Sequence, residues 1–198
     1  MTSAESMFEK LRSFLERSVV ITEEQFELIK TLFIPKEVKK GEFLLREGEM
    51  TKYAMFVASG CLRTYTIDSK GKEHILQFSP ENWWTGDSSF TKGVPAQCFI
   101  DALEDSEILL FETDSIQKIN EYIPRFAANY QAALQKSLVA KNRRIVASLS
   151  ATAAERYNDF LKIYPSIAQR VPQHMIASYL GISPETLSRI RKQQSHKR

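Results

Sequence analysis

The sequence has no long apolar run. A helix needs about 18 or more consecutive apolar residues to cross a bilayer, and no such stretch occurs. The N-terminus, M-T-S-A-E-S-M-F-E-K, is acidic and lacks the continuous apolar stretch of a secretory signal peptide. We therefore expect a cytoplasmic protein with no membrane partner.

Cysteine and histidine are also scarce, which limits metal and redox chemistry. Cys61 and Cys98 each fall in an expected strand, where a small buried side chain is the ordinary interpretation and a redox pair is the alternative. An iron–sulfur cluster needs about four cysteine thiolates. The histidines, His74, His174 and His196, are scattered, so no metal site is expected. Because no phosphate-binding loop or nucleophile motif occurs, we expect neither enzyme activity nor catalytic residues.

Charge is distributed unevenly along the chain. The net charge of the 198 residues is +3. From Val139 onward, eleven Lys and Arg face three acidic residues, a net of +8, which leaves −5 for the preceding residues. A basic C-terminal third on an acidic N-terminal body is typical of a nucleic-acid-binding module attached to a domain that does not touch nucleic acid.

The N-terminal half predicts two helices followed by a β-structure. The helices cover residues 5–16 and a segment from Thr22, where Gln25 completes a capping box. From Phe33, short apolar segments alternate with turn residues about every eight to twelve positions, which favours an all-β sandwich or barrel and most simply a jelly roll. The expected strands include 43–45, 53–57, 62–67, 75–78, 98–103 and 107–111.

A long helix is expected to start at Pro124, since proline at the first helical position loses no hydrogen bond. Its apolar residues recur mostly at intervals of four or seven, which indicates a narrow seam rather than a wide core face. The seam is either a dimer contact of the coiled-coil kind or the side that packs on the chain's own β-structure, and we expect both, on different sides. Its members are Phe126, Tyr130, Leu134, Leu138 and Ile145.

The segment from Gln173 to Lys192 has the pattern of a helix-turn-helix. Gly181 is suited to end the first helix, and Ser183 with Pro184 is suited to begin the second. The second helix of such a motif lies in the DNA major groove. The alternative is an ordinary helical hairpin in which Glu185 and Arg189 form a surface pair.

Three stretches carry a resemblance to a known family. The sequence A-x-x-L-G-I-S-P-E-T-L-S-R in the motif, together with K-K-G-E-F-L-L-R-E-G-E and F-V-A-S-G-C-L-R, resembles the Crp/Fnr family of bacterial transcription regulators. The resemblance extends from about Phe33 to Lys192. It implies an α+β protein with three parts: a β-roll with flanking helices (1–123), a long dimerisation helix (124–149) and a winged helix-turn-helix (150–198), with any wing confined to 167–171.

The resemblance also implies which two residues read the bases, and the polar and charged residues around them are expected to contact phosphates or adjacent base edges. Arg189 is expected to bind guanine, and Glu185 is expected to accept a hydrogen bond from a cytosine amine. Pro184 occupies a place where other members have a third base-reading arginine. The full set is Gln173, Ser183, Pro184, Glu185, Thr186, Ser188, Arg189, Arg191 and Lys192. The implied partners are double-stranded DNA, a second copy of the chain and RNA polymerase.

The β-roll departs from the cyclic-nucleotide-binding pattern of the family. That pattern has Gly-Glu and, about ten residues later, an Arg that pairs with the cyclic phosphate. Here Asp87 replaces the glutamate and Gln97 the arginine, and a neutral amide cannot balance a buried phosphate. The candidate effector pocket is Gly86, Asp87, Ser88, Gln97 and Cys98. We therefore expect no control by cyclic AMP, while another small-molecule effector stays open.

Aromatic residues of this region have two interpretations. The two interpretations are that they line an apolar pocket or that they belong to the core; the residues are Trp83, Trp84, Phe78, Phe90 and Phe99.

The function expected from the sequence is a dimeric, sequence-specific DNA-binding regulator. The alternative is an effector-sensing or protein-interaction β-roll with weak, non-specific DNA binding.

Overall fold

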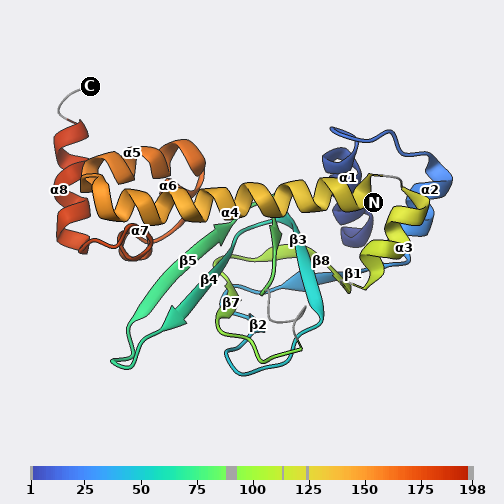
Figure 1. The fold of residues 1–198 in the computed structure, drawn as a ribbon, viewed down its shortest axis with the longest axis horizontal. Helices are drawn as coiled ribbons and strands as arrows, with labels where there is room; N and C mark the ends of the chain where they lie inside the picture. Colours follow the sequence, from blue (N-terminus) through green and yellow to red (C-terminus); the bar gives the residue numbers. More distant parts are fainter. Residues whose placement is uncertain (1, 88–92, 113, 124, 196–198) are drawn as a thin grey trace. The chain divides into compact units, whose positions relative to one another are not determined.

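The computed structural model describes residues 2–87, 93–112, 114–123 and 125–195 (Figure 1). The chain divides into two compact units. The first consists of Met1–Thr64 and Phe78–Gln135, and the second of Tyr65–Gln77 and Lys136–Arg198. No helix in the described ranges is both long and apolar enough to cross a membrane.

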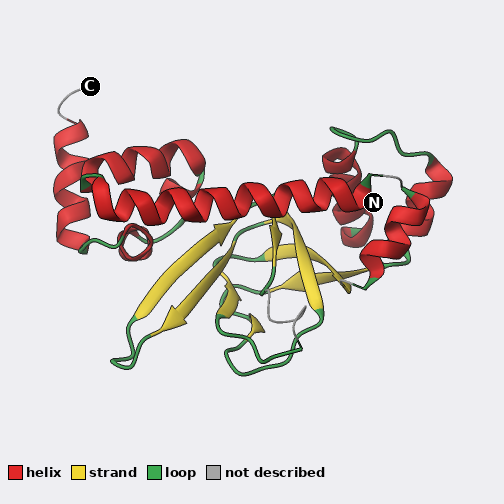
Figure 2. Ribbon diagram, viewed as in Figure 1, coloured by secondary structure: helices red, strands yellow, loops and turns green. Residues whose placement is uncertain are grey.

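Strands occupy the middle of the chain and helices its two ends (Figure 2). The N-terminal helices are α1 (Ser3–Leu15) and α2 (Glu23–Lys30). The strands are β1 (Phe33–Val38), β2 (Phe43–Leu45), β3 (Tyr53–Ser59), β4 (Leu62–Ile67), β5 (Glu73–Ser79), β6 (Trp84–Thr85), β7 (Phe99–Ala102) and β8 (Ser106–Glu112). The predicted α+β class and the jelly-roll-like strand pattern are confirmed.

The strands form two antiparallel sheets, with orders β1-β8-β3-β6 and β2-β7-β4-β5. In the first sheet β8 lies between β1 and β3, so Phe111 is opposite Phe33 on one side and Ala54 on the other. Gly60 follows β3 with a φ of 90°, and a Cβ added there would lie 2.2 Å from the Ser106 side-chain oxygen. Only glycine fits that close approach.

Trp84 is at the centre of an aromatic cluster in the core of the first unit. Its ring lies 4.9 Å from that of Phe56, 5.3 Å from that of Phe111 and 5.5 Å from that of Tyr130. Phe56 and Phe111 are fully buried in the core that α1 and α2 complete. The core interpretation is therefore the correct one for Trp84, because its ring is enclosed by neighbouring rings.

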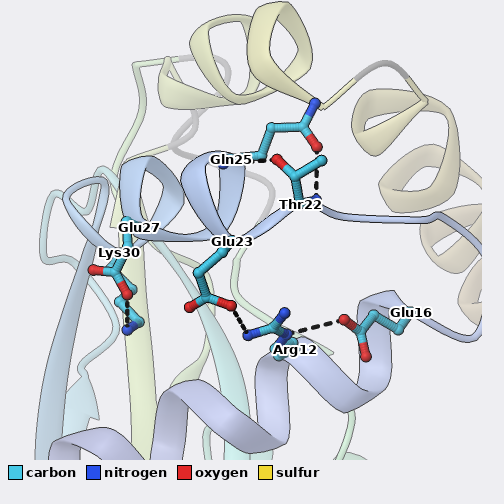
Figure 3. A network of polar contacts seen from close by, with 7 residues as sticks. All are labelled: Arg12, Glu16, Thr22, Glu23, Gln25, Glu27 and Lys30. Atoms are coloured by element: carbon cyan, nitrogen blue, oxygen red, sulfur yellow. Dashed lines mark hydrogen bonds and ion pairs between the residues drawn. The ribbon is translucent and has the colours of Figure 1, made fainter.

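Polar contacts cap α2 and join it to α1 (Figure 3). As predicted, Thr22 and Gln25 form a capping box at the start of α2. Arg12 of α1 donates to Glu16 at 2.9 Å and to Glu23 of α2 at 2.6 Å. These hydrogen bonds to carboxylates raise the pKa of the Arg12 guanidinium. The contacts fix α2 relative to α1 over the core.

Two further helices follow β8. Helix α3 (Ser115–Tyr122) was not predicted, and Pro124 lies outside the described residues. Helix α4 (Phe126–Ser150) has 25 residues, close to the predicted length. The division between the two units falls within α4, after Gln135.

The C-terminal helices form a small core of their own in the second unit. They are α5 (Ala153–Ile163), α6 (Ile167–Arg170), α7 (Gln173–Leu180) and α8 (Pro184–Ser195). Phe160 is 1% exposed, and its ring lies 5.3 Å from that of Tyr164 and 5.5 Å from that of Tyr179. The predicted short wing is wrong: the segment that would carry it is the helical turn α6, with Ile167 fully buried, and no strand follows β8 in the described ranges.

Candidate functional site

The turn between α7 and α8 has the geometry that the sequence predicts. Gly181 adopts the left-handed conformation, with φ 65° and ψ 38°. The Ile182 amide then donates to the Ala177 carbonyl at 3.0 Å, which closes the end of α7. Ser183 Oγ accepts from the Thr186 amide at 3.2 Å, so Ser183 caps α8 and Pro184 is its first residue. The two helices of the motif are thus fixed by local hydrogen bonds.

Apolar side chains pack the two helices together. Leu187 and Ile190 of α8 are 0% and 6% exposed, and Ile176 and Leu180 of α7 are 0% and 5% exposed. Burial of these positions three and four residues apart leaves the other side of α8 exposed. That exposed side carries Pro184, Glu185, Ser188 and Arg189.

An open groove of about 660 Å³ lies between the start of α7 and the exposed side of α8. Its lining residues are Gln173, Pro184, Glu185, Ser188, Arg189, Lys192 and Gln193. Six of the predicted DNA contacts are therefore brought together, while Ser183, Thr186 and Arg191 lie outside the lining. Gln193 was not predicted, although it is four residues after Arg189 and eight after Glu185, a spacing that places all three on one helix face.

The groove presents both hydrogen-bond acceptors and donors. The Glu185 carboxylate accepts hydrogen bonds from the Glu185 backbone amide and from the Ser183 hydroxyl. These hydrogen bonds lower the pKa of Glu185. Glu185 is therefore an acceptor at neutral pH, and the Arg189 guanidinium supplies only donors. No ion pair joins these two side chains in the described ranges. The alternative of a Glu185–Arg189 surface pair is not the arrangement seen, and both groups face the groove.

The candidate effector pocket is only partly assembled. Cys98 Sγ donates to Asp87 Oδ2 at 2.9 Å, so these two residues meet. Gln97 is exposed, between the buried residues Ala96 and Cys98, and therefore points away from the interior. Gly86 is exposed, and Ser88 lies outside the described residues. The residue at the phosphate-binding arginine position is thus neither charged nor directed inward. Both cysteines are buried thiols that form no disulfide with each other, as the simpler interpretation predicted.

A buried ion pair in the second sheet, β2-β7-β4-β5, was missed by sequence reasoning. Arg63 of β4 donates to the two carboxylate oxygens of Asp101 of β7, at 2.7 and 2.9 Å. Their side chains are 10% and 6% exposed. The pairing is bidentate, so the charge of Arg63 is already balanced within the sheet. No signal in the sequence connects the two positions, because β4 and β7 are distant in the chain. The described residues contain no cluster of metal-ligating side chains.

The predicted dimer seam of α4 divides into two groups. Phe126 and Tyr130 are 1% and 5% exposed and belong to the core of the first unit, so these two make the other contact expected of the seam, packing within their own chain. Burial also raises the pKa of Tyr130 to about 12. In contrast, Leu134, Leu138 and Ile145 are 41%, 52% and 57% exposed. Of the five predicted seam residues, these three are exposed.

The sequence is similar to a known domain family and to known proteins. Residues 35–121 match the model of the cyclic nucleotide-binding domain. The transcriptional activator protein anr of Pseudomonas aeruginosa is 27% identical over 169 residues, which are 78% of this chain and 68% of that protein. The fumarate and nitrate reduction regulatory protein of Vibrio cholerae is 24% identical over 166 residues, 78% of this chain and 66% of that protein.

A solved structure with a similar fold is FixK2 from Bradyrhizobium japonicum. Its TM-score is 0.72 at 23% identity, and the match covers 83% of this chain and 85% of that chain. At this identity the likeness concerns the fold alone. It extends over both units, so the combination of a β-roll with a C-terminal helical motif is shared.

Proposed function

We propose that the chain is a transcription regulator of the Crp/Fnr family that binds a specific DNA sequence as a homodimer and is not controlled by cyclic AMP. The observation that carries the proposal is the groove of the helix-turn-helix. Its lining places a charged acceptor, Glu185, and a guanidinium donor, Arg189, on the exposed side of a capped helix. Cytoplasmic location and contact with RNA polymerase are part of the proposal.

Recognition would take place in the major groove. Arg189 donates two hydrogen bonds to guanine O6 and N7, and Glu185 accepts one from a cytosine amine. Gln173, at the start of α7, reaches the same groove and binds a phosphate or an adjacent base edge. Lys192 supplies charge that attracts any DNA sequence.

A second copy of the chain would supply the second reading helix. Two recognition helices related by two-fold symmetry enter successive major grooves about 34 Å apart, so the site is a pseudo-palindrome. Exposed apolar side chains on α4 support this arrangement. Leu134, Leu138 and Ile145 are spaced as a helix–helix seam and are 41%, 52% and 57% exposed.

The proposed insensitivity to cyclic AMP follows from charge. A cyclic phosphate buried in the roll needs a cationic partner. The residue at the family's arginine position is the exposed Gln97, and Arg63 is already paired with Asp101. The protein is then either competent without a ligand or controlled by an effector of different chemistry.

Selection from a random duplex pool, with purified protein and no added ligand, tests the proposal. Enrichment of a palindrome with half-sites one helical turn apart supports a dimeric reader that is competent alone. Enrichment only after addition of cell extract points to a required effector. Binding that depends on salt but enriches no motif contradicts specific recognition and favours the alternative of a sensing or protein-interaction roll with weak DNA contact.

A further inference from the structure

Side chains of two helices meet the edge of strand β5 within the second unit. β5 is the last strand in its sheet, so the outer edge of the strand carries backbone groups that pair with no strand in the described ranges. The Ile75 amide donates to Ser178 Oγ at 3.1 Å, and the same hydroxyl donates to the Glu73 carbonyl at 3.0 Å. Ser178 of α7 therefore satisfies two backbone groups that a neighbouring strand would otherwise satisfy.

Arg144 of α4 contacts the same strand and the same helix. Its Nη1 donates to the carbonyl of Leu76 at 2.9 Å and to that of Ile75 at 3.3 Å. The guanidinium carbon also lies 4.4 Å from the centroid of the Tyr179 ring, an attractive cation–π arrangement. Because Tyr179 follows Ser178 in α7, the two sets of contacts hold adjacent residues of one helix.

Helix α7 determines where the recognition helix lies. Ile176 and Leu180 of α7 are buried with Leu187 of α8, and Gln173 at the start of α7 lines the groove. The two helices are also joined by the tight turn at Gly181. A contact that fixes α7 therefore fixes α8.

We propose that Ser178 and Arg144 are positioning residues that hold the recognition helix through the edge of β5. The inference rests on the proposed DNA-binding function. With these contacts formed, Glu185, Ser188 and Arg189 stay exposed. The contacts thus leave the exposed side of α8 free to contact DNA. They also favour DNA binding, because a helix that is already held in place loses less conformational freedom on binding.

Ser178→Ala removes the hydroxyl without changing charge. Alanine has the higher helix propensity, so α7 itself is not weakened. Loss of the hydrogen bonds to β5 should speed exchange of the Ile75 amide and weaken binding to the selected duplex about 3- to 10-fold, the effect of losing about one net hydrogen bond. Affinity for random DNA should not change. Ser178→Thr, which keeps a hydroxyl, should restore both readouts.

Ser148→Ala is the matched control, since that hydroxyl donates only within its own helix, to Ile145 at 2.6 Å. It should leave both readouts as in the wild type. Arg144→Lys keeps the charge but loses the planar fork, and should weaken specific binding in the same direction as Ser178→Ala.

Each outcome decides the inference. Faster Ile75 exchange with unchanged specific affinity would refute the positioning role, and unchanged exchange would refute the contact itself. Equal weakening on selected and random DNA would also refute it, because positioning acts on sequence reading. If the wild-type protein selects no motif either alone or with cell extract, the proposed function fails and this role fails with it. The exchange measurement, which needs no DNA, still reports whether Ser178 holds β5.

Discussion

Replacement of Arg189 by alanine should separate recognition from folding. The side chain is exposed in the groove and forms no ion pair with Glu185 in the described ranges. Since it supports no folding contact, the free energy of unfolding should change by less than about 0.5 kcal/mol. Loss of a bidentate contact with guanine should cost about 1–3 kcal/mol in each half-site. That corresponds to about 5- to 150-fold in affinity for each half-site.

The assay is a fluorescence-anisotropy titration on the selected duplex and on a scrambled duplex, with thermal unfolding measured in parallel. Arg191→Ala is the control, because it removes the same side chain from the same helix but outside the groove lining. Arg191→Ala should weaken binding to both duplexes by the same factor. Equal losses on both duplexes for Arg189→Ala would refute the base-reading role. A clear drop in melting temperature would show that the residue supports the fold instead.

Three other substitutions test the surface charge, the turn and the dimer seam. Lys192→Ala should weaken binding to all sequences alike and reduce the salt slope by about one unit; an unchanged slope means no phosphate contact. Gly60→Ala should destabilise the protein by more than about 1 kcal/mol in urea unfolding, because its Cβ would lie 2.8 Å from the Ser106 Cα and the φ of 90° disfavours a side chain; unchanged stability would contradict the turn. Leu138→Asp should yield monomers in analytical ultracentrifugation. It should weaken binding to the full palindrome much more than binding to a single half-site. An intact dimer would exclude this seam as the dimer contact.

Features encoded by neighbouring residues were predictable from the sequence. The end of α7 at Gly181, the Ser183 cap of α8 and the Thr22–Gln25 capping box each depend on residues within four positions of one another. The grouping of Glu185 and Arg189 on one side of a helix follows from the same short spacing. For this reason the motif and most of its groove lining were predictable residue by residue.

Contacts between distant segments were not predictable in this way. The Arg63–Asp101 pair joins positions 38 residues apart, and Ser178 reaches β5 across more than 100 residues. Neither pairing has a periodic or spacing signal. Residues 167–171, to which any wing was confined, have too few positions to show a period; Ile167–Arg170 form the helical turn α6, with Ile167 buried.

The seam of α4 shows why a correct periodicity can still give a wrong partner. A helix that packs on a sheet and a helix that packs on another helix both repeat apolar residues at three, four and seven. The aromatic positions Phe126 and Tyr130 meet Trp84 in the core, whereas the aliphatic positions from Leu134 onward are exposed. The same stripe is therefore buried at its start and exposed further along the helix. Since the change occurs close to the division after Gln135, the exposed part of the stripe is the part that continues toward the helix-turn-helix. A dimer contact there would couple the spacing of the two reading helices to α4 rather than to the roll.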